Sequence, residues 1–131
     1  MRMPAITGVS PRVLEQLAAG GSVQILIRSS NNLDAVRKLE PGDYVFVTSV
    51  GKREMKEGVE GIVATVKSIR IVHERLVSGG PEEEHFEREF EAARIVLTKS
   101  GLGSVREVKD YGLGKRTEVE VELRSTVSEA Y

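Results

Sequence analysis

Hydrophobic positions near the start of the chain recur first at helical spacing and then in strict alternation. Ser10-Pro11 and Gly20-Gly21 are typical of a helix start and end, and the apolar residues between them share one helical face: Val13, Leu14, Leu17 and Ala18. Over residues 22–28 the pattern alternates, which predicts a strand whose inward face carries Val23, Ile25 and Ile27. Leu26 interrupts the polar face of that strand, so we expect something to cover that face as well.

The following stretch, RSSNNLDAVRKLEPGDYVFV at residues 28–47, holds a polar cluster, a short helix, a turn and an apolar strand. Asn32 can cap a helix from Leu33 to Leu39, whose charged residues are placed as the helix dipole favours. Glu40-Pro41-Gly42-Asp43 predicts a tight turn. Tyr44 to Val47 is apolar on both faces, which indicates a central strand that is covered on both sides.

A charged loop from Gly51 to Gly61 leads into a long predicted strand, Ile62 to Val72, whose hydrophobic phase slips. Apolar residues keep one parity as far as Val66 and the other parity from Ile69 onward. A β-bulge near Lys67-Ser68 would produce this slip, and small barrels use such bulges to bend their strands.

The segment from Glu82 to Leu97 is compatible with two structures. Its phenylalanines and alanines follow helical spacing, and its composition favours a helix. As a strand, the same segment would pair back on Ile69–Val77 across a turn at residues 78–81. We expect a hairpin strand from about Ile95 onward and leave residues 82–92 open between helix and strand.

The C-terminal part contains two Gly-Leu-Gly sequences, at residues 101–103 and 112–114, which we interpret as turns. The alternating segments after them predict a hairpin whose last strand places glutamates outward and apolar residues inward. The inward set is Val119, Val121 and Leu123. In total the chain predicts two or three short helices and five to six strands, which is an α+β domain built on a small, mostly antiparallel β-barrel.

Length and composition narrow the class of protein. The 131 residues predict a single domain, residues 1–131, that can bury a core without disulfides. The absence of cysteine excludes thiolate metal sites and fits a reducing compartment. The sequence shows neither an apolar leader nor a run of membrane-spanning length, so we expect a cytoplasmic protein that does not associate with membranes.

The charge is nearly balanced overall but is uneven along the chain. The formal net charge of −1 gives no signal for non-specific binding to nucleic acids. Residues 1–72 sum to +3 and residues 73–131 to −4, because ten basic and seven acidic residues precede nine basic and thirteen acidic ones. A polyanion would therefore meet the N-terminal half.

Two ordered motifs occupy about residues 5–72. The first, ITGVSPRVLEQLAAGGSVQILIR, is similar to the opening of ASCH domains, with a strand, a short helix, a glycine and a strand that ends in arginine. The second, SSNNLDAVRKLEPGDYVFVTSVG followed by GIVATVKSI, is similar to the EVE core, in which an RN-rich loop leads to a short helix, K-x-GD and two strands. The chain therefore resembles the PUA-like superfamily and its small uncharacterised archaeal proteins, which implies a single PUA-like domain.

The resemblance implies recognition more than catalysis. Hydrolytic ASCH members carry Lys and Glu between the glycine and the arginine, whereas the corresponding positions here are Ser22, Val23 and Leu26. EVE-type pockets hold a modified base by aromatic stacking, but this chain has no Trp, and we expect only Tyr44 and Phe46 near the pocket. We therefore expect a binding protein that needs no cofactor, and leave open whether it is an enzyme.

The strongest candidate site is the cluster Arg28, Ser29, Ser30, Asn31 and Asn32. It combines a bidentate donor, two hydroxyls and two amides at a strand end, a set that can hold a phosphate or the edge of a base. The alternative is that Asn32 only caps the helix and that the serines only turn the chain.

Two further pairs of residues are candidates. Thr48 and Ser49 could complete the pocket from a neighbouring strand end, or they are ordinary strand-end hydroxyls. Lys52 and Arg53 could contact a nucleic-acid backbone, or they lie in a solvated loop diluted by glutamates. The only histidines are His73 and His85, and nothing enforces a metal-ligand spacing around them, so we expect no metal site.

These observations give three hypotheses for function. The first is a nucleic-acid-binding module for RNA or a modified nucleotide, with its pocket around residues 28–32. The second is an enzyme or sensor for a nucleoside or an amide, for which Asp43 and Glu60 are the carboxylates expected near the pocket. The third is a protein-interaction module that uses the acidic C-terminal hairpin as an edge for a partner or a homodimer.

Overall fold

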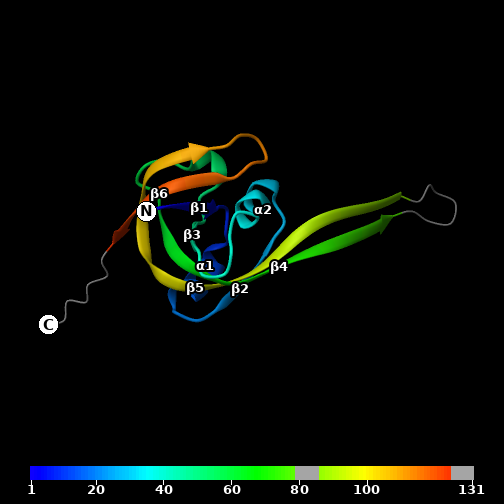
Figure 1. Cartoon of the computed structure of the whole chain (residues 1–131), viewed down its shortest axis with the longest axis horizontal. Coiled ribbons are helices and arrows are strands. Elements are labelled where there is room, and N and C mark those ends of the chain that lie inside the picture. The colour runs from blue at the N-terminus through cyan, green and yellow to red at the C-terminus, as the bar shows by residue number, and fades with distance from the viewer. Residues whose placement is uncertain (79–85, 125–131) are drawn as a thin grey trace.

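The computed structural model describes residues 1–78 and 86–124, with the side chains of all of these except residues 74–78 and 86–90. The elements follow one another as shown in Figure 1. In chain order they are β1 (Arg2–Ile6), α1 (Pro11–Ala18), β2 (Val23–Ile27), α2 (Ser30–Val36), β3 (Tyr44–Val47), the short 3-10 helix η1 (Lys52–Glu54), β4 (Glu60–Ser78), β5 (Phe86–Asp110) and β6 (Thr117–Arg124).

The described strands form one six-stranded sheet that closes on itself. Their order is β2-β5-β4-β3-β1-β6, and β5 also pairs with β6. Strands β5, β4, β3, β1 and β6 therefore make a ring, while β2 is added along β5 and has no second strand beside it in the described chain. The β1–β3 pair is parallel and the other pairs are antiparallel, which agrees with the expected small α+β domain.

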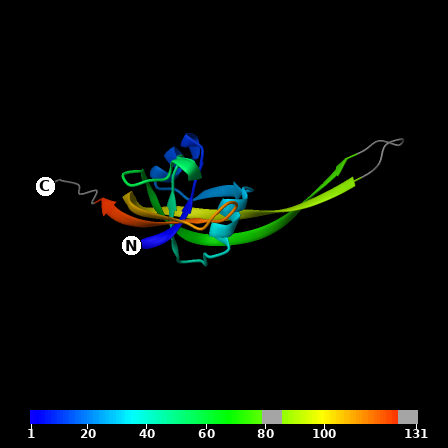
Figure 2. The same ribbon diagram turned by 90° about the horizontal axis from the view of Figure 1, so that it is seen from above.

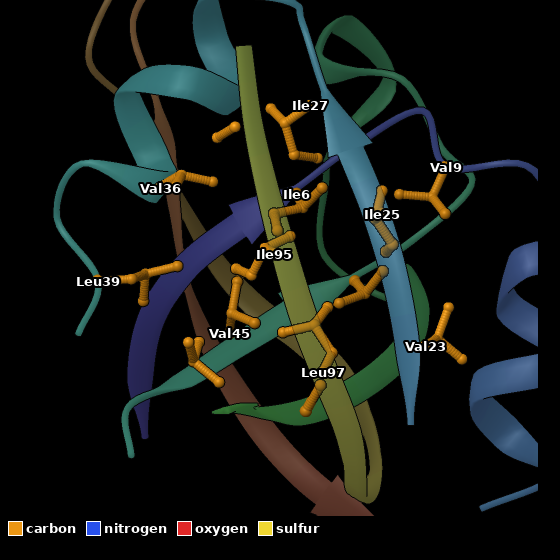
Figure 3. Packing of buried hydrophobic residues seen from close by; sticks show 14 of the residues in the cluster. Ile6, Val9, Val23, Ile25, Ile27, Val36, Leu39, Val45, Ile95 and Leu97 are labelled. Atoms are coloured by element: carbon orange, nitrogen blue, oxygen red, sulfur yellow. The ribbon is translucent and has the colours of Figure 1, made fainter. Parts of the chain in front are cut away.

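Both sides of the ring are covered by apolar residues, which form two clusters. The larger cluster joins the helices to β1–β5, and Figure 3 shows Ile25 and Ile95 among its members. The smaller cluster takes residues from every strand of the ring, with Phe46 fully buried at its centre. Strand β3 serves both clusters, because Val45 faces the first and Phe46 the second. The expected central strand is thereby confirmed.

The first helix and the bulged strand are also confirmed. The Ser10 hydroxyl accepts a hydrogen bond from the backbone N–H of Val13, and Gly20 follows the helix with a φ of 97°. In β4, the pairing register with β5 shifts between Val66 and Ser68, next to the expected bulge, and also between Val63 and Ala64. Beyond the ring, β4 and β5 continue together as a two-stranded ribbon that extends away from the body (Figures 1 and 2).

The second helix begins earlier than expected. Helix α2 starts at Ser30 with Ser29 at the N-cap position, so the prediction that Asn32 caps a helix from Leu33 to Leu39 is wrong. The reason is that the Asn32 side chain is bound elsewhere, to the backbone of Thr7. Residues 86–92, which were open between helix and strand, are strand and pair with β4, because the ladder that starts near Ile95 continues outward.

The first Gly-Leu-Gly sequence is not a turn. Gly103 lies inside β5 opposite Gly61, and a Cβ on Gly103 would collide with the Val121 side chain, so this glycine serves a close approach of strands. The second sequence is a turn, and Gly112 has a φ of 116°. The turn expected at residues 78–81 lies mostly outside the described residues.

Two leucines are more exposed than expected. Leu26 is 41% exposed, so the expectation that its face of β2 is covered is not met within the described residues. Leu123 is 51% exposed, although Val119 and Val121 are buried as predicted. No helix within the described residues is long and apolar enough to cross a membrane.

Replacing Gly61 with alanine should lower the free energy of unfolding by about 1–3 kcal/mol. A Cβ at this position would lie 2.6 Å from the ring of Phe46 and 2.6 Å from the carbonyl oxygen of Val47, so core or backbone has to move. Gly21→Ala is the matched control, because nothing lies within 4 Å of a Cβ there. Urea unfolding followed by circular dichroism checks both variants, and equal losses would contradict the packing argument.

Candidate functional site

A cavity with a volume of about 570 Å³ lies beside β2. Its walls come from the β1–α1 loop, residues 24–27 of β2, the start of α2, and the residues just before and at the start of η1. Ligand-binding cavities commonly have volumes of about 300–1,000 Å³. We call this cavity the β2 groove. Its lining residues are Thr7, Gly8, Val9, Ser10, Val13, Gln24, Ile25, Leu26, Ile27, Arg28, Ser29, Asn31, Asn32, Gly51 and Lys52.

Asn32 holds one end of the groove together. Its Oδ1 accepts a hydrogen bond from the backbone N–H of Thr7 at 3.0 Å, and its Nδ2 donates to the carbonyl oxygen of Thr7 at 2.9 Å. The Asn32 side chain thus makes the two backbone hydrogen bonds that a neighbouring strand would otherwise make with Thr7. Asn32 is only 8% exposed. Both polar ends of this amide are used by the protein, so Asn32 shapes the groove and leaves the ligand to its neighbours.

Arg28, Ser29 and Asn31 form the polar rim of the groove. Arg28 follows the last residue of β2, and Ser29 follows Arg28 as the N-cap residue of α2. The Ser29 hydroxyl makes no capping hydrogen bond. The Asn31 amide donates to the Thr7 hydroxyl at 3.1 Å and to Asn32 Oδ1 at 3.3 Å.

Ser30 and Arg53 lie on the other side of this rim. Both line a neighbouring hollow of about 540 Å³ that reaches the exposed turn between β5 and β6. The predicted cluster is therefore brought together around the start of α2, but its members face more than one hollow.

Thr48 and Ser49 are not part of the groove lining. Thr48 is buried, and its hydroxyl donates to the carbonyl oxygen of Glu60 at 3.3 Å and accepts from the N–H of Val50 at 3.2 Å. Ser49 is exposed and lines no cavity among those found in the described part of the chain. The structure thus supports the alternative of ordinary strand-end hydroxyls.

Lys52 lines the groove but is bound to the β5–β6 turn. Its Nζ donates to the carbonyl oxygens of Gly112 and, at 2.6 Å, Lys115, and lies 3.1 Å from Asp110 Oδ1. These contacts fix η1 against the turn. The pKa of Asp110 lies below its usual value, mainly because the N–H of Gly112 donates to its carboxylate and also because Lys52 lies beside it. Lys52 therefore contributes charge to the groove while its ammonium stays anchored.

The chemical character of the groove is apolar inside and polar at the rim. Among the residues that the structure describes, its lining contains two cationic side chains but no carboxylate, histidine or aromatic ring. Asp43 lies in the turn before β3, where its carboxylate accepts from the N–H of Glu40 at 2.8 Å, and Glu60 pairs with Arg124. Tyr44 and Phe46, expected near the pocket, also lie elsewhere.

A second set of charges fastens α2 to the start of β6. Asp34 Oδ2 accepts from the backbone N–H of Arg116 at 2.9 Å, which is the main reason why the pKa of Asp34 lies below its usual value. Burial is the largest single effect on Glu118 and disfavours its charged form, but the hydrogen bond from Arg116 Nε at 2.6 Å, the Arg116 charge and the Tyr111 hydroxyl together lower the pKa of that carboxyl. The guanidinium also stacks 3.9 Å from the centre of the Tyr111 ring.

No metal site is formed by the residues whose side chains are described. No group of three or more potential ligands gathers there, and His73 is exposed on the β4–β5 ribbon. His85, the other candidate, lies outside the described residues.

Sequence reasoning missed one whole wall of the groove. The β1–α1 loop, Thr7 to Ser10, carries no charged residue, and its sequence predicts only the start of a helix. The opposite wall could have been predicted from Gln24 and Leu26, which occupy the outward positions of the alternating strand just before Arg28. What the sequence could not show is that these two segments lie on either side of one cavity.

Comparisons with known proteins identify relatives of this chain. The model of a family described as "Protein of unknown function (DUF473)" matches residues 1–119. The uncharacterised protein MJ0105 of Methanocaldococcus jannaschii is 26% identical over 84 residues, which cover 64% of this chain and 55% of that protein, so the match spans about half of its length. The expected kinship with uncharacterised archaeal proteins is confirmed at this level.

One solved structure has a similar fold. It is the N-terminal domain of a Mycobacterium avium complex Lon protease, with a TM-score of 0.54 and 14% identity. The alignment covers 99% of this chain and 58% of that one. At this identity the likeness concerns the fold alone.

Asn32→Ala should lower the free energy of unfolding by about 2–4 kcal/mol, because two buried backbone groups of Thr7 lose their partner. Asn31→Ala is the matched control, since its amide reaches only side-chain atoms, and we expect a loss of about 1 kcal/mol or less. Urea unfolding at pH 7 measures both. If the two variants lose the same stability, Asn32 does not hold the loop as described.

Asp34→Asn should lower stability at pH 7 by roughly 1 kcal/mol, because a charged hydrogen-bond acceptor becomes a neutral one. The pKa of Asp34 is lowered in the folded protein, so its contribution is present above the unfolded pKa and is lost as the pH falls through the folded pKa. Unfolding curves from pH 7 to pH 3 should therefore converge for the variant and the parent protein below about pH 4. A difference that stays constant with pH would contradict this.

Proposed function

This chain belongs to the DUF473 family, whose description assigns no activity, and we propose that it is a recognition domain that binds its ligand in the β2 groove. The observation that carries the proposal is the groove lining itself. An apolar floor with a rim of amide, hydroxyl and guanidinium groups suits binding. A proton-transferring enzyme would need a titratable acid or base at the reacting atoms, and the described lining provides no carboxylate or histidine.

We further propose that the closed ring is a PUA-like barrel. The support is the ordered resemblance of residues 5–72 to ASCH and EVE segments, and a ring of strands with helices on one of its apolar clusters. On this proposal the first ligand class to test is RNA or a modified nucleotide. On this proposal Arg28, Ser29 and Asn31 contact the polar part of the ligand, while Asn32 and Lys52 hold the walls of the groove in place.

A second candidate function, a protein-interaction module, is favoured by a specific observation. Strand β2 is an edge strand, and the groove lies along it. Exposed strand edges are ready templates for another chain. The acidic C-terminal hairpin, which the sequence suggested for this role, is instead paired on both of its strands within the ring.

The nucleotide form of the proposal is tested by titrating labelled RNA and DNA oligonucleotides and nucleoside monophosphates at low and high salt. We expect binding that weakens with salt and a loss of about tenfold in Arg28→Ala. Arg70→Ala is the matched control, because Arg70 is an exposed arginine on β4 that does not line the groove. Binding that is unaffected by Arg28→Ala, or affected equally by the control, would contradict a role for this rim.

A further inference from the structure

The outer edge of β2 is open. In the described chain β2 forms a ladder with β5 alone, through the pairs from Val23–Leu97 to Ile27–Ala93. No other hydrogen bond in the described chain reaches the backbone of Val23–Ile27. In an edge strand, alternate N–H and C=O groups point away from the single partner. Strand β2 therefore presents a row of backbone donors and acceptors on its free side.

The groove runs along this open edge. Successive side chains of a strand point to opposite faces, so a hollow over one face would touch only every second residue. The β2 groove touches five consecutive residues, Gln24 to Arg28. It must therefore meet the strand from the side, where the unpaired backbone groups lie.

The opposite wall of the groove is held away from β2. In the β1–α1 loop, the N–H of Gly8 donates to the carbonyl oxygen of Val50 at 2.9 Å, and the N–H of Val9 donates to the carbonyl oxygen of Thr48 at 3.0 Å. These bonds tie the loop to the segment that follows β3, and the Asn32 clamp ties Thr7 to α2. The loop cannot close onto β2 without losing them, so the space between the two walls is a built slot.

We infer that the natural occupant of this slot is an extended peptide segment that adds to β2 as a further strand. The inference rests on the proposed recognition role of the groove and names its ligand class. Main-chain hydrogen bonds to the β2 edge would supply affinity, and the groove walls would select side chains. At roughly 3.3 Å per residue, the five residues of β2 match about five residues of the partner.

The walls also define the chemistry of the peptide. Val9 and Val13 offer an apolar wall on one side, and Leu26 is 41% exposed on the outer face of β2. The charged side chains that the described residues contribute to the lining are cationic, Arg28 and Lys52. The fitting partner therefore alternates apolar residues along an extended segment and carries an acidic residue or a terminal carboxylate at the Arg28 end.

The same lining argues against single-stranded RNA as the occupant. Sequence-tolerant binding of single strands relies on aromatic rings on which bases stack, and none lines the groove. A neutral, continuous strand edge instead matches the backbone of a peptide. RNA binding at the groove is therefore the outcome that separates this inference from the broader proposal.

The probe is a display library of random octapeptides, selected against the whole chain, from which enriched peptides are synthesised. We expect enriched sequences to alternate apolar residues and to carry an acidic group at one end. Amide hydrogen exchange of the ¹⁵N-labelled chain then reports the binding mode. A strand added to β2 slows the exchange of alternate amides between Val23 and Arg28, a period of two that surface contact alone does not produce.

Leu26→Asp should weaken the selected peptides by at least about tenfold, which corresponds to 1.4 kcal/mol. The substitution removes an apolar contact and adds a charge on an open strand edge, and Leu26 is exposed enough for the fold to tolerate it. Leu113→Asp is the matched control with the same change in charge, because Leu113 is 95% exposed and does not line the groove.

The remaining outcomes test the strand-addition inference and the proposed recognition role separately. Enriched peptides that protect no β2 amide, or that bind Leu26→Asp as well as the parent chain, overturn the strand-addition inference. RNA oligonucleotides that change groove amides when no peptide does overturn it too, but they support the recognition role. If neither peptides, oligonucleotides nor nucleotides change the groove amides, both the inference and the proposed function are wrong.

Discussion

The long strand β5 changes partners along its length, and the architecture follows from this. Near Ile95 it lies between β4 and β2, from Leu102 to Ser104 it lies between β4 and β6, and beyond Ser104 it pairs, among the described strands, with β6 alone. A strand has only two edges, so β2 and β6 can share one edge of β5 only by occupying different parts of it. The sheet therefore closes through β6 at one end and leaves β2 as an added strand at the other.

The β2 groove follows from the same arrangement, and one side chain completes it. Because β2 is added to the ring, no strand of the described chain pairs with its outer edge, and the β1–α1 loop runs opposite it. Asn32 fixes that loop by bonding both the N–H and the carbonyl of Thr7. Buried amides that satisfy backbone groups in this way set a single conformation, since any alternative leaves polar groups unpaired. The shape of the groove is thus determined by contacts that do not need a ligand.

Local patterns were sufficient to predict the elements that have their own signals. The Ser10 cap, the two-sided strand at Val45 and Phe46, and the phase slip before Ser68 are all written in neighbouring residues. Predictions failed where a distant partner decides the structure. The sequence predicts Asn32 as a helix cap, but its side chain binds the backbone of Thr7. It predicts Gly103 in a turn, but this glycine lies in a strand and leaves room for the Val121 side chain. Likewise, the sequence places Arg28 and Asn31 together but cannot show that Lys52 is bound to the β5–β6 turn.

Closure of the ring through β1 also has a consequence for how the chain folds. The first strand pairs with the last, and the N-terminal ammonium bonds a residue 119 positions away, Glu120. The long β4–β5 hairpin, by contrast, joins segments that are near neighbours in sequence and can zip together early. Loop-closure entropy must be overcome before β1 and β6 meet, which slows folding in proteins rich in distant pairings. During synthesis, β1 emerges long before its β6 partner exists, so the ring is completed only after the last described strand has been made.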